Sequence, residues 1–278
     1  MSVAASSALK TRDIKPKIGT EIHADKQTLL SGVHAAEIRD LLEQRGVLVF
    51  PKLGVTDEEQ LEFTRTLGST ARERTGEEVF TISLDPEKSS GVDYLKGAFY
   101  WHFDGVIQAR PILASLLSAK VLPPTGGNTE FCNTYAAYEE LPEDEKAKLQ
   151  KLRVVHSNWA PLLYHDPEPQ QEKLKLFAGF GEVELPLVWT HRSGRKSLVL
   201  GCTATQVIGM DRRESALLLN GLREWATSER FFYSHTWSVG DMVMWDNTGT
   251  LHRATPYPLD SGRELHRTKL EGEEPIAA

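Results

Sequence analysis

A chain of 278 residues with 40% hydrophobic and 26% charged residues has the composition of an ordinary globular protein, long enough for one large domain or two small ones. Its formal net charge of −7 at pH 7 and its pI of about 5.8 argue against a general surface for nucleic acid. No run of about 18 apolar residues occurs, and the N-terminal segment is too weakly apolar for a signal peptide, so we expect a cytoplasmic protein without a membrane span.

The first part of the chain predicts two helices around a short buried strand. Apolar side chains recur at helical spacing over 32–46, which indicates an amphipathic helix. Residues 47–50 are a continuous apolar run bounded by glycine and proline, as in a buried strand. A capping box at Thr56 begins a helix over 56–67. Residues 69–97 are polar and irregular, and we expect a mobile loop near the mouth of a site.

Short apolar runs typical of strands dominate the rest of the chain. We expect strands at 112–121, 128–133, 152–157, 186–190, 197–202 and 242–246. Helices are expected at 134–151 and 211–227. The inner face of the second helix is predicted to comprise Leu217, Leu218, Leu222 and Trp225. The polar segment 158–184 is too long for a hairpin turn, so we expect a lid or a subunit contact, with a disordered insertion as the alternative.

Many short strands with helices before and between them indicate a single domain over 1–278, mainly β with flanking helices and therefore α+β. The pattern suits a β-sandwich or a jelly roll. Cys132 and Cys202 lie in apolar, strand-like runs, and two cysteines cannot make a disulfide framework. We expect buried free thiols in a reducing compartment.

The run Trp101-His102-Phe103-Asp104 offers two metal ligands at close spacing. In a strand, residues i and i+2 point to the same side, so His102 and Asp104 can reach one ion while Phe103 points into hydrophobic packing. A third ligand, His252, would come from a strand distant in sequence and adjacent in the sheet. Two imidazoles and one carboxylate form the facial triad of non-haem Fe(II) oxygenases.

Other chemistries remain open at this point. The chain has nine histidines, so accidental pairs occur, and Asp104 with His252 can be a polar core pair. A zinc hydrolase also uses two histidines and a carboxylate, and a jelly-roll module can hold metal without turnover. Arg263 and Arg267 are four residues apart, which places both on one face of a strand. Two guanidinium groups beside a metal suit carboxylate ligands and favour the oxygenase.

An ordered set of motifs makes the chain resemble a known family, the Fe(II)/2-oxoglutarate-dependent dioxygenases of the taurine dioxygenase and aryloxyacetate dioxygenase (TauD/TfdA) type. The resemblance runs from about Gly46 to the C-terminus. The motifs are Trp101-His102-Phe103-Asp104, Gly126-Gly127-Asn128-Thr129-Glu130-Phe131, Gly240-Asp241-Met242-Val243-Met244-Trp245-Asp246-Asn247, and His252-Arg253 followed by Arg263 and Arg267. This resemblance implies the double-stranded β-helix, which is a jelly roll, and its C-terminal arginine motif is closer to the aryloxyacetate branch.

The same resemblance implies cofactors and residue roles. Fe(II) is held by His102, Asp104 and His252, and 2-oxoglutarate and O2 take the open sites. The far carboxylate of 2-oxoglutarate is expected to pair with Arg263, with Thr129 as an added hydroxyl donor; the alternative for Thr129 is an ordinary β-branched strand residue.

The substrate side of the site is also implied by the resemblance. Arg267 faces the substrate anion, or else has a structural role or supports the cosubstrate. Trp245 is expected to pack beside this pocket, and Tyr100 to line it or belong to the core.

The implied reaction is hydroxylation of a C–H bond in a small anionic substrate, with succinate and CO2 as coproducts and with bond cleavage where the hydroxylated carbon bears a heteroatom. Aryloxyacetates, sulfonates and other carboxylates are the expected classes. Residues 69–74 lack the His and Tyr of the taurine enzymes, so taurine is not expected. We expect no nucleic acid or membrane partner, and a dimer or tetramer as in relatives.

Overall fold

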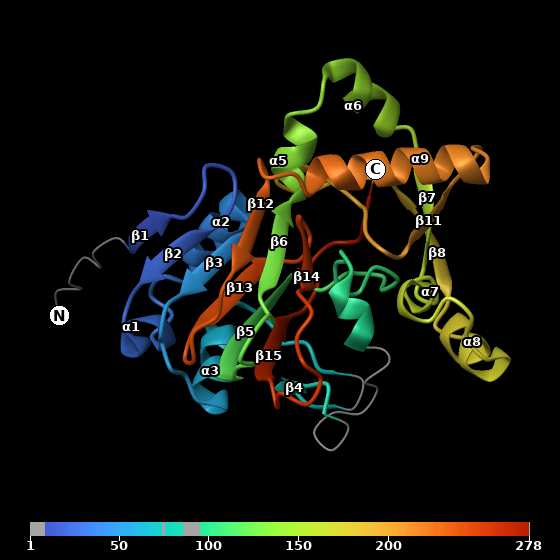
Figure 1. The fold of residues 1–278 in the computed structure, drawn as a ribbon. Coiled ribbons are helices and arrows are strands. Elements are labelled where there is room, and N and C mark those ends of the chain that lie inside the picture. Colours follow the sequence, from blue (N-terminus) through green and yellow to red (C-terminus); the bar gives the residue numbers. More distant parts are fainter. Residues whose placement is uncertain (1–8, 74–75, 86–94, 278) are drawn as a thin grey trace.

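The computed structural model describes residues 9–73, 76–85 and 95–277 (Figure 1). Two sheets lie at its centre, and helices pack outside them. The larger sheet has the strand order β1-β2-β3-β13-β5-β15-β4, and its neighbours are antiparallel except for β2 and β3. Its strands span Lys10–Asp13 (β1), Thr20–His23 (β2), Val47–Phe50 (β3), Phe80–Ile82 (β4), Ala114–Val121 (β5), Met242–Asp246 (β13) and Glu264–Leu270 (β15).

The smaller sheet, in the order β12-β6-β14, covers one face of the larger one. Its strands span Phe232–His235 (β12), Thr129–Asn133 (β6) and Thr250–Ala254 (β14). Alternation along β13 shows how the space between the sheets is built. Val243 and Trp245 pack toward Phe131 of β6, whereas Met242 and Met244 pack on the opposite face. The mainly hydrophobic interior between the two sheets therefore receives every second side chain of β13.

Helices cover the outer face of the larger sheet. They are α1 (Lys26–Leu30), α2 (Ala35–Arg45) and α3 (Asp57–Leu67). Ile38 and Leu42 of α2 and Phe63 of α3 pack with Leu48 and Met244 of the sheet. The capping box that begins α3 is confirmed, since Thr56 Oγ1 accepts from the Glu59 N–H and the Glu59 carboxylate accepts from the Thr56 N–H.

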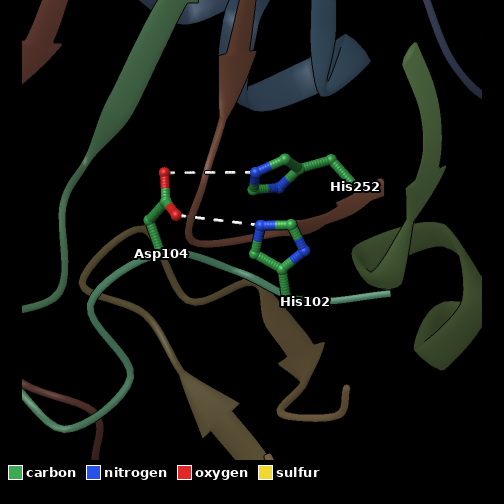
Figure 2. A group of neighbouring side chains, drawn as sticks. All are labelled: His102, Asp104 and His252. Atoms are coloured by element: carbon green, nitrogen blue, oxygen red, sulfur yellow. Dashed lines mark ion pairs between the residues drawn. The ribbon is translucent and has the colours of Figure 1, made fainter. Parts of the chain in front are cut away.

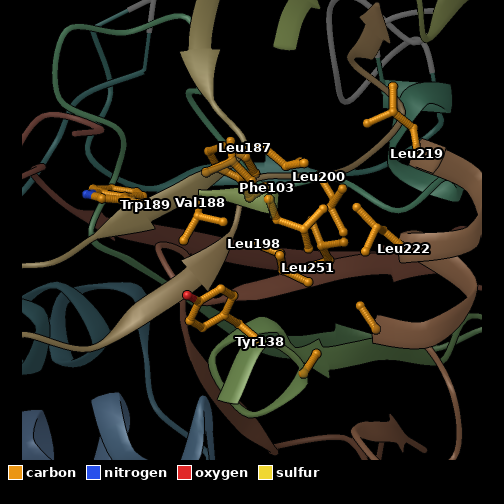
Figure 3. Packing of buried hydrophobic residues seen from close by; sticks show 14 of the residues in the cluster. Phe103, Tyr138, Leu187, Val188, Trp189, Leu198, Leu200, Leu219, Leu222 and Leu251 are labelled. Carbon is orange, nitrogen blue, oxygen red and sulfur yellow. The ribbon is translucent and has the colours of Figure 1, made fainter. Parts of the chain in front are cut away.

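A second hydrophobic cluster covers the outer face of the smaller sheet. Leu251 of β14 packs there with Phe103, Leu198 and Leu222 (Figure 3). The remaining elements of the chain are η1 (Lys96–Phe99), α5 (Thr134–Glu139), α6 (Glu143–Leu149), β7 (Arg153–Ser157), α7 (Leu162–His165), α8 (Gln171–Ala178), β8 (Glu182–Pro186), β9 (Val188–Thr190), β10 (Lys196–Leu198), β11 (Ala204–Val207) and α9 (Arg212–Ala226). In Figure 1, α5, α6 and α9 gather at one end of the strands.

The α+β class and most predicted strands and helices are confirmed. Cys132 and Cys202 are buried free thiols, as expected. Among the residues that the structure describes, no helix is both long and apolar enough to cross a membrane.

Four local predictions are wrong in detail. Residues 134–151 form two helices, because the proline at Pro142 disfavours a helical residue before it. On α9, Leu217 is 66% exposed, and Leu219 lies in the core in its place. The segment 158–184 contains α7, α8 and the start of β8 and is not an irregular loop, whereas its role as a lid or a subunit contact stays a prediction.

The fourth correction concerns 69–97. This segment supplies β4, which pairs with β15, and η1. Residues 74–75 and 86–94 of it lie outside the described residues.

Candidate active site

The segment with His102 is joined to β14 by a pair of backbone hydrogen bonds. His102 N donates to His252 O at 3.1 Å, and His252 N donates to His102 O at 2.9 Å. Asp104 lies in the turn that follows, so the expected regular strand over His102 and Asp104 is wrong. The Asn247 side chain holds this turn, since it accepts from Asp104 N and donates to Asp104 O, both at 2.8 Å. Phe103 points into the hydrophobic cluster, as expected.

The predicted metal ligands come together. The ligand atoms of His102, Asp104 and His252 lie within 4.8 Å of one another, and no other such group of His, Cys or acidic side chains occurs among the described residues. Asp104 faces both imidazoles (Figure 2), with Nε2 of His102 at 3.9 Å from Oδ1 and Nε2 of His252 at 4.0 Å from Oδ2. These separations exceed hydrogen-bond length and suit atoms that share an ion.

The protonation pattern of these groups fits a divalent cation. His102 Nδ1 lies 2.7 Å from the carbonyl oxygen of Tyr100, which can only accept, so the proton sits on Nδ1 and Nε2 offers a lone pair. Burial, with the neighbouring His102, holds the pKa of His252 well below its usual value. Burial alone would raise the pKa of Asp104, but the charge of the neighbouring Arg267 guanidinium lowers it. The donor set at neutral pH therefore contains neutral His252 and a carboxylate, as Fe(II) prefers.

Arg263 is a buried guanidinium without a carboxylate partner in the part of the chain that the structure describes. It is 3% exposed, packs 4.6 Å from the Tyr257 ring centroid, and donates from Nη2 to Gly127 O at 3.1 Å. No carboxylate of the described residues interacts with it, and its Nε has no hydrogen-bond partner among them. Burial lowers its pKa. Gly127 is required nearby, because a Cβ at that residue would lie 3.0 Å from Arg263 Nε.

Thr129 lies two residues beyond Gly127, at the start of β6, and is 5% exposed. Its Oγ1 accepts from the Trp237 indole N–H at 3.0 Å. Because the oxygen is already an acceptor, the hydroxyl proton is available to donate to a ligand.

Arg267 lies between two carboxylates. Its Nη1 is 3.3 Å from Asp104 Oδ2, and its Nη2 is 2.7 Å from Glu73 Oε1. Lys269 Nζ is 2.8 Å from the same Glu73 oxygen. The sequence pattern does not single out Glu73 or Lys269. Lys269 could have been found, because it is two residues beyond Arg267 on the same strand, but Glu73 carries no local signal.

The two aromatic candidates differ. The Trp245 ring lies 4.7 Å from the His252 ring, and its buried indole N–H has no hydrogen-bond partner among the described residues. Tyr100 instead turns its ring toward α7, where its hydroxyl donates to Tyr164 O at 2.9 Å and the ring centroids are 4.9 Å apart. Tyr100 thus contacts the site by its carbonyl oxygen, on His102.

Comparisons with known proteins identify the family to which the chain is similar. The family described as "Taurine catabolism dioxygenase TauD, TfdA family" matches residues 10–269. The alpha-ketoglutarate-dependent 2,4-dichlorophenoxyacetate dioxygenase of Burkholderia sp. is 35% identical over 270 residues, which are 89% of this chain and 90% of the relative. The alkylsulfatase of Acinetobacter baylyi is 32% identical over 95% of this chain and 86% of its own. The crystal structure of AAD-2 in complex with Mn(II) and N-oxalylglycine superposes with a TM-score of 0.83 at 32% identity, covering 98% of this chain and 100% of that one.

Proposed function

This chain belongs to the taurine catabolism dioxygenase TauD, TfdA family, and from that premise we propose how its own residues serve the reaction. It is an Fe(II)- and 2-oxoglutarate-dependent dioxygenase. Bound Fe(II) and 2-oxoglutarate supply the oxidising chemistry that hydroxylates a substrate C–H bond with O2 and releases succinate and CO2. Family membership favours this reading over a metal-binding module without turnover or a zinc hydrolase.

Three side chains hold the iron in this proposal: His102, Asp104 and His252. The observation that carries it is their convergence within 4.8 Å, with both Nε2 atoms facing the Asp104 carboxylate. The Tyr100 carbonyl fixes the tautomer of His102, and Asn247 fixes the turn of Asp104. Such supporting contacts orient metal ligands before the ion arrives.

Arg263 and Thr129 bind 2-oxoglutarate in this proposal. A guanidinium that is buried without a carboxylate is costly unless a ligand supplies one. The far carboxylate of 2-oxoglutarate has the charge and the planar shape for bidentate pairing with Arg263. The Thr129 hydroxyl proton adds a neutral donor, because its oxygen already accepts from Trp237.

The primary substrate is a small organic anion that binds at Arg267. This guanidinium touches Asp104 and therefore borders the metal centre. The two relatives described above act, by their names, on an aryloxyacetate and on alkyl sulfates, which each carry one negative charge. Trp245 forms an aromatic wall beside His252 and helps to exclude water.

The two facing sheets are, in our proposal, the double-stranded β-helix or jelly roll of this family. Likeness to the AAD-2 structure over 98% of the chain supports this assignment. A single domain over 1–278, a cytoplasmic location and a dimer or tetramer stay predictions.

Two measurements test the proposed function. Anaerobic addition of 2-oxoglutarate to the Fe(II) protein should give a weak visible charge-transfer band. Succinate release should then depend on a substrate from a panel of aryloxyacetates, alkylsulfonates, alkyl sulfates and amino acids. His252→Ala is the negative control for both. Absence of the band and of succinate from the native protein would refute the proposal.

A further inference from the structure

Strand β15 places two cations next to the proposed metal centre. Arg267 and Lys269 point to the same face of the strand, opposite Thr268 and Leu270, which are buried on the side of α3. The side chains of Arg267 and Lys269 are 18% and 7% exposed. One carboxylate forms an ion pair with both cations, because a single oxygen, Glu73 Oε1, lies 2.7 Å from Arg267 Nη2 and 2.8 Å from Lys269 Nζ. Glu73 is itself 14% exposed at its side chain. It is thus a buried counter-charge in the substrate region.

The backbone around Glu73 is tied to β15. Ala71 N donates to Lys269 O at 2.9 Å, and Glu271 N donates to Ser69 O at 2.8 Å. Burial by itself would raise the pKa of Glu73, but the charges of Arg267 and Lys269 lower it, so the side chain is a carboxylate at neutral pH. Its negative charge is therefore held in place by fixed backbone and two cations.

Formal charges show what the pocket can accept. In a formal sum over the loaded site, the two positive charges of Fe(II) offset the two negative charges of 2-oxoglutarate. The negative charge of Asp104 likewise offsets the positive charge of Arg263. The remaining set of Arg267, Lys269 and Glu73 has one net positive charge. The Lys269 ammonium has three N–H donors, and Glu73 accepts from one of them, so donors remain for a second anion.

We propose that Glu73 is a specificity-determining residue: by cancelling one of the two cations on β15, it makes the pocket select substrates with a single negative charge over those with two. This inference rests on the proposed function, since the substrate anion is taken to bind at Arg267. A dianion meets the Glu73 carboxylate as well as the cations, and like charges at close range are costly. A substrate with one negative charge neutralises the one net positive charge of the pocket.

Hexyl sulfate and hexyl phosphate are suitable probes. Both are tetrahedral esters with the same alkyl chain. At pH 8 the sulfate carries one negative charge and the phosphate nearly two, because the second pKa of a phosphate monoester is about 6. Their dissociation constants are measured by anaerobic titration calorimetry on the complex with Fe(II) and 2-oxoglutarate. Binding of 2-oxoglutarate is measured first in the same preparation.

The native complex should bind hexyl sulfate more tightly than hexyl phosphate. Glu73→Gln keeps the shape and removes the charge, so it should shift the affinity ratio toward the phosphate by about tenfold or more, equivalent to about 1.4 kcal/mol. The double variant Glu73→Gln/Lys269→Met restores one net positive charge and should return the ratio to that of the native protein. A merely structural role for Glu73 does not predict this compensation.

The matched control is Glu78→Gln. Glu78 belongs to the same chain segment and also joins two arginines, Arg65 and Arg72, but these are exposed and outside the site. This variant should leave the ratio unchanged.

An unchanged ratio in Glu73→Gln, or failure of the native complex to bind either ester, overturns the inference. Failure to bind 2-oxoglutarate overturns the proposed function instead. If Glu73→Gln does not fold, Lys269→Met decides instead: it leaves Arg267 and Glu73 with no net charge, so it should shift the ratio further toward the sulfate, and an unchanged ratio overturns the inference.

Discussion

Replacing Arg263 with leucine isolates the pairing between this guanidinium and the far carboxylate of 2-oxoglutarate. Arg263 is 3% exposed and has no carboxylate partner among the described residues, so we expect 2-oxoglutarate to supply the pairing carboxylate. Removing one partner of a buried, hydrogen-bonded charge pair costs about 2–5 kcal/mol. The apparent KM for 2-oxoglutarate should therefore increase by a factor between about 30 and several thousand.

The same substitution should affect the ligand-free protein far less. Arg263 loses one hydrogen bond to Gly127 O and its contact with the Tyr257 ring, but a buried cation without a counter-ion also disappears. These effects have opposite signs, so the melting temperature without 2-oxoglutarate should change little. The native protein with a divalent metal should gain thermal stability when 2-oxoglutarate is added, whereas Arg263→Leu should gain none.

The assay combines succinate formation at varied 2-oxoglutarate with anaerobic titration of the charge-transfer band. Arg253→Leu is the matched control, because Arg253 also stacks on an aromatic ring, that of Trp101, but has its own carboxylate partner in Glu130. A KM for 2-oxoglutarate that is unchanged in Arg263→Leu would show that the cosubstrate carboxylate binds elsewhere.

Three further predictions follow from the site. His102→Ala, Asp104→Ala and His252→Ala should each abolish succinate formation with the fold intact by circular dichroism; substantial turnover in one would remove that residue from the triad. Arg267→Leu should weaken binding of the primary substrate and uncouple decarboxylation from hydroxylation while 2-oxoglutarate binding persists. An unchanged substrate KM and unchanged coupling would show that Arg267 has a structural role. Thr129→Val should raise the KM for 2-oxoglutarate by about 2- to 12-fold, the loss of one neutral hydrogen bond of about 0.5–1.5 kcal/mol, and equal KM values would exclude a donor role.

The chemistry of the proposed metal site can be predicted from the sequence because each ligand type is specific. Residue types and their order indicate His102, Asp104 and His252, and the fold brings their ligand atoms together. The strand geometry that the spacing of His102 and Asp104 predicts is wrong, however. Asp104 is held by the Asn247 side chain in a turn, a contact between residues far apart in sequence that strand periodicity does not encode.

Local rules also predict the elements that depend on neighbours in sequence. The capping box at Thr56 and the buried strand β3 follow from such short-range signals. The spacing of apolar residues in the segments 69–97 and 158–184 is irregular, so the helices and strands of these segments cannot be predicted from the sequence. Strand β4 exists because it pairs with β15, nearly two hundred residues later.

The amino-acid sequence by itself therefore determined the family, the reaction class and the residues that can ligate iron, because these depend on residue types in a fixed order. Only the tertiary structure placed Glu73 between Arg267 and Lys269. That contact arises from the hydrogen bonds that tie residues 69–71 to the end of β15. Charge balance in a pocket is a property of groups close in space, and pairing between distant strands decides which groups those are.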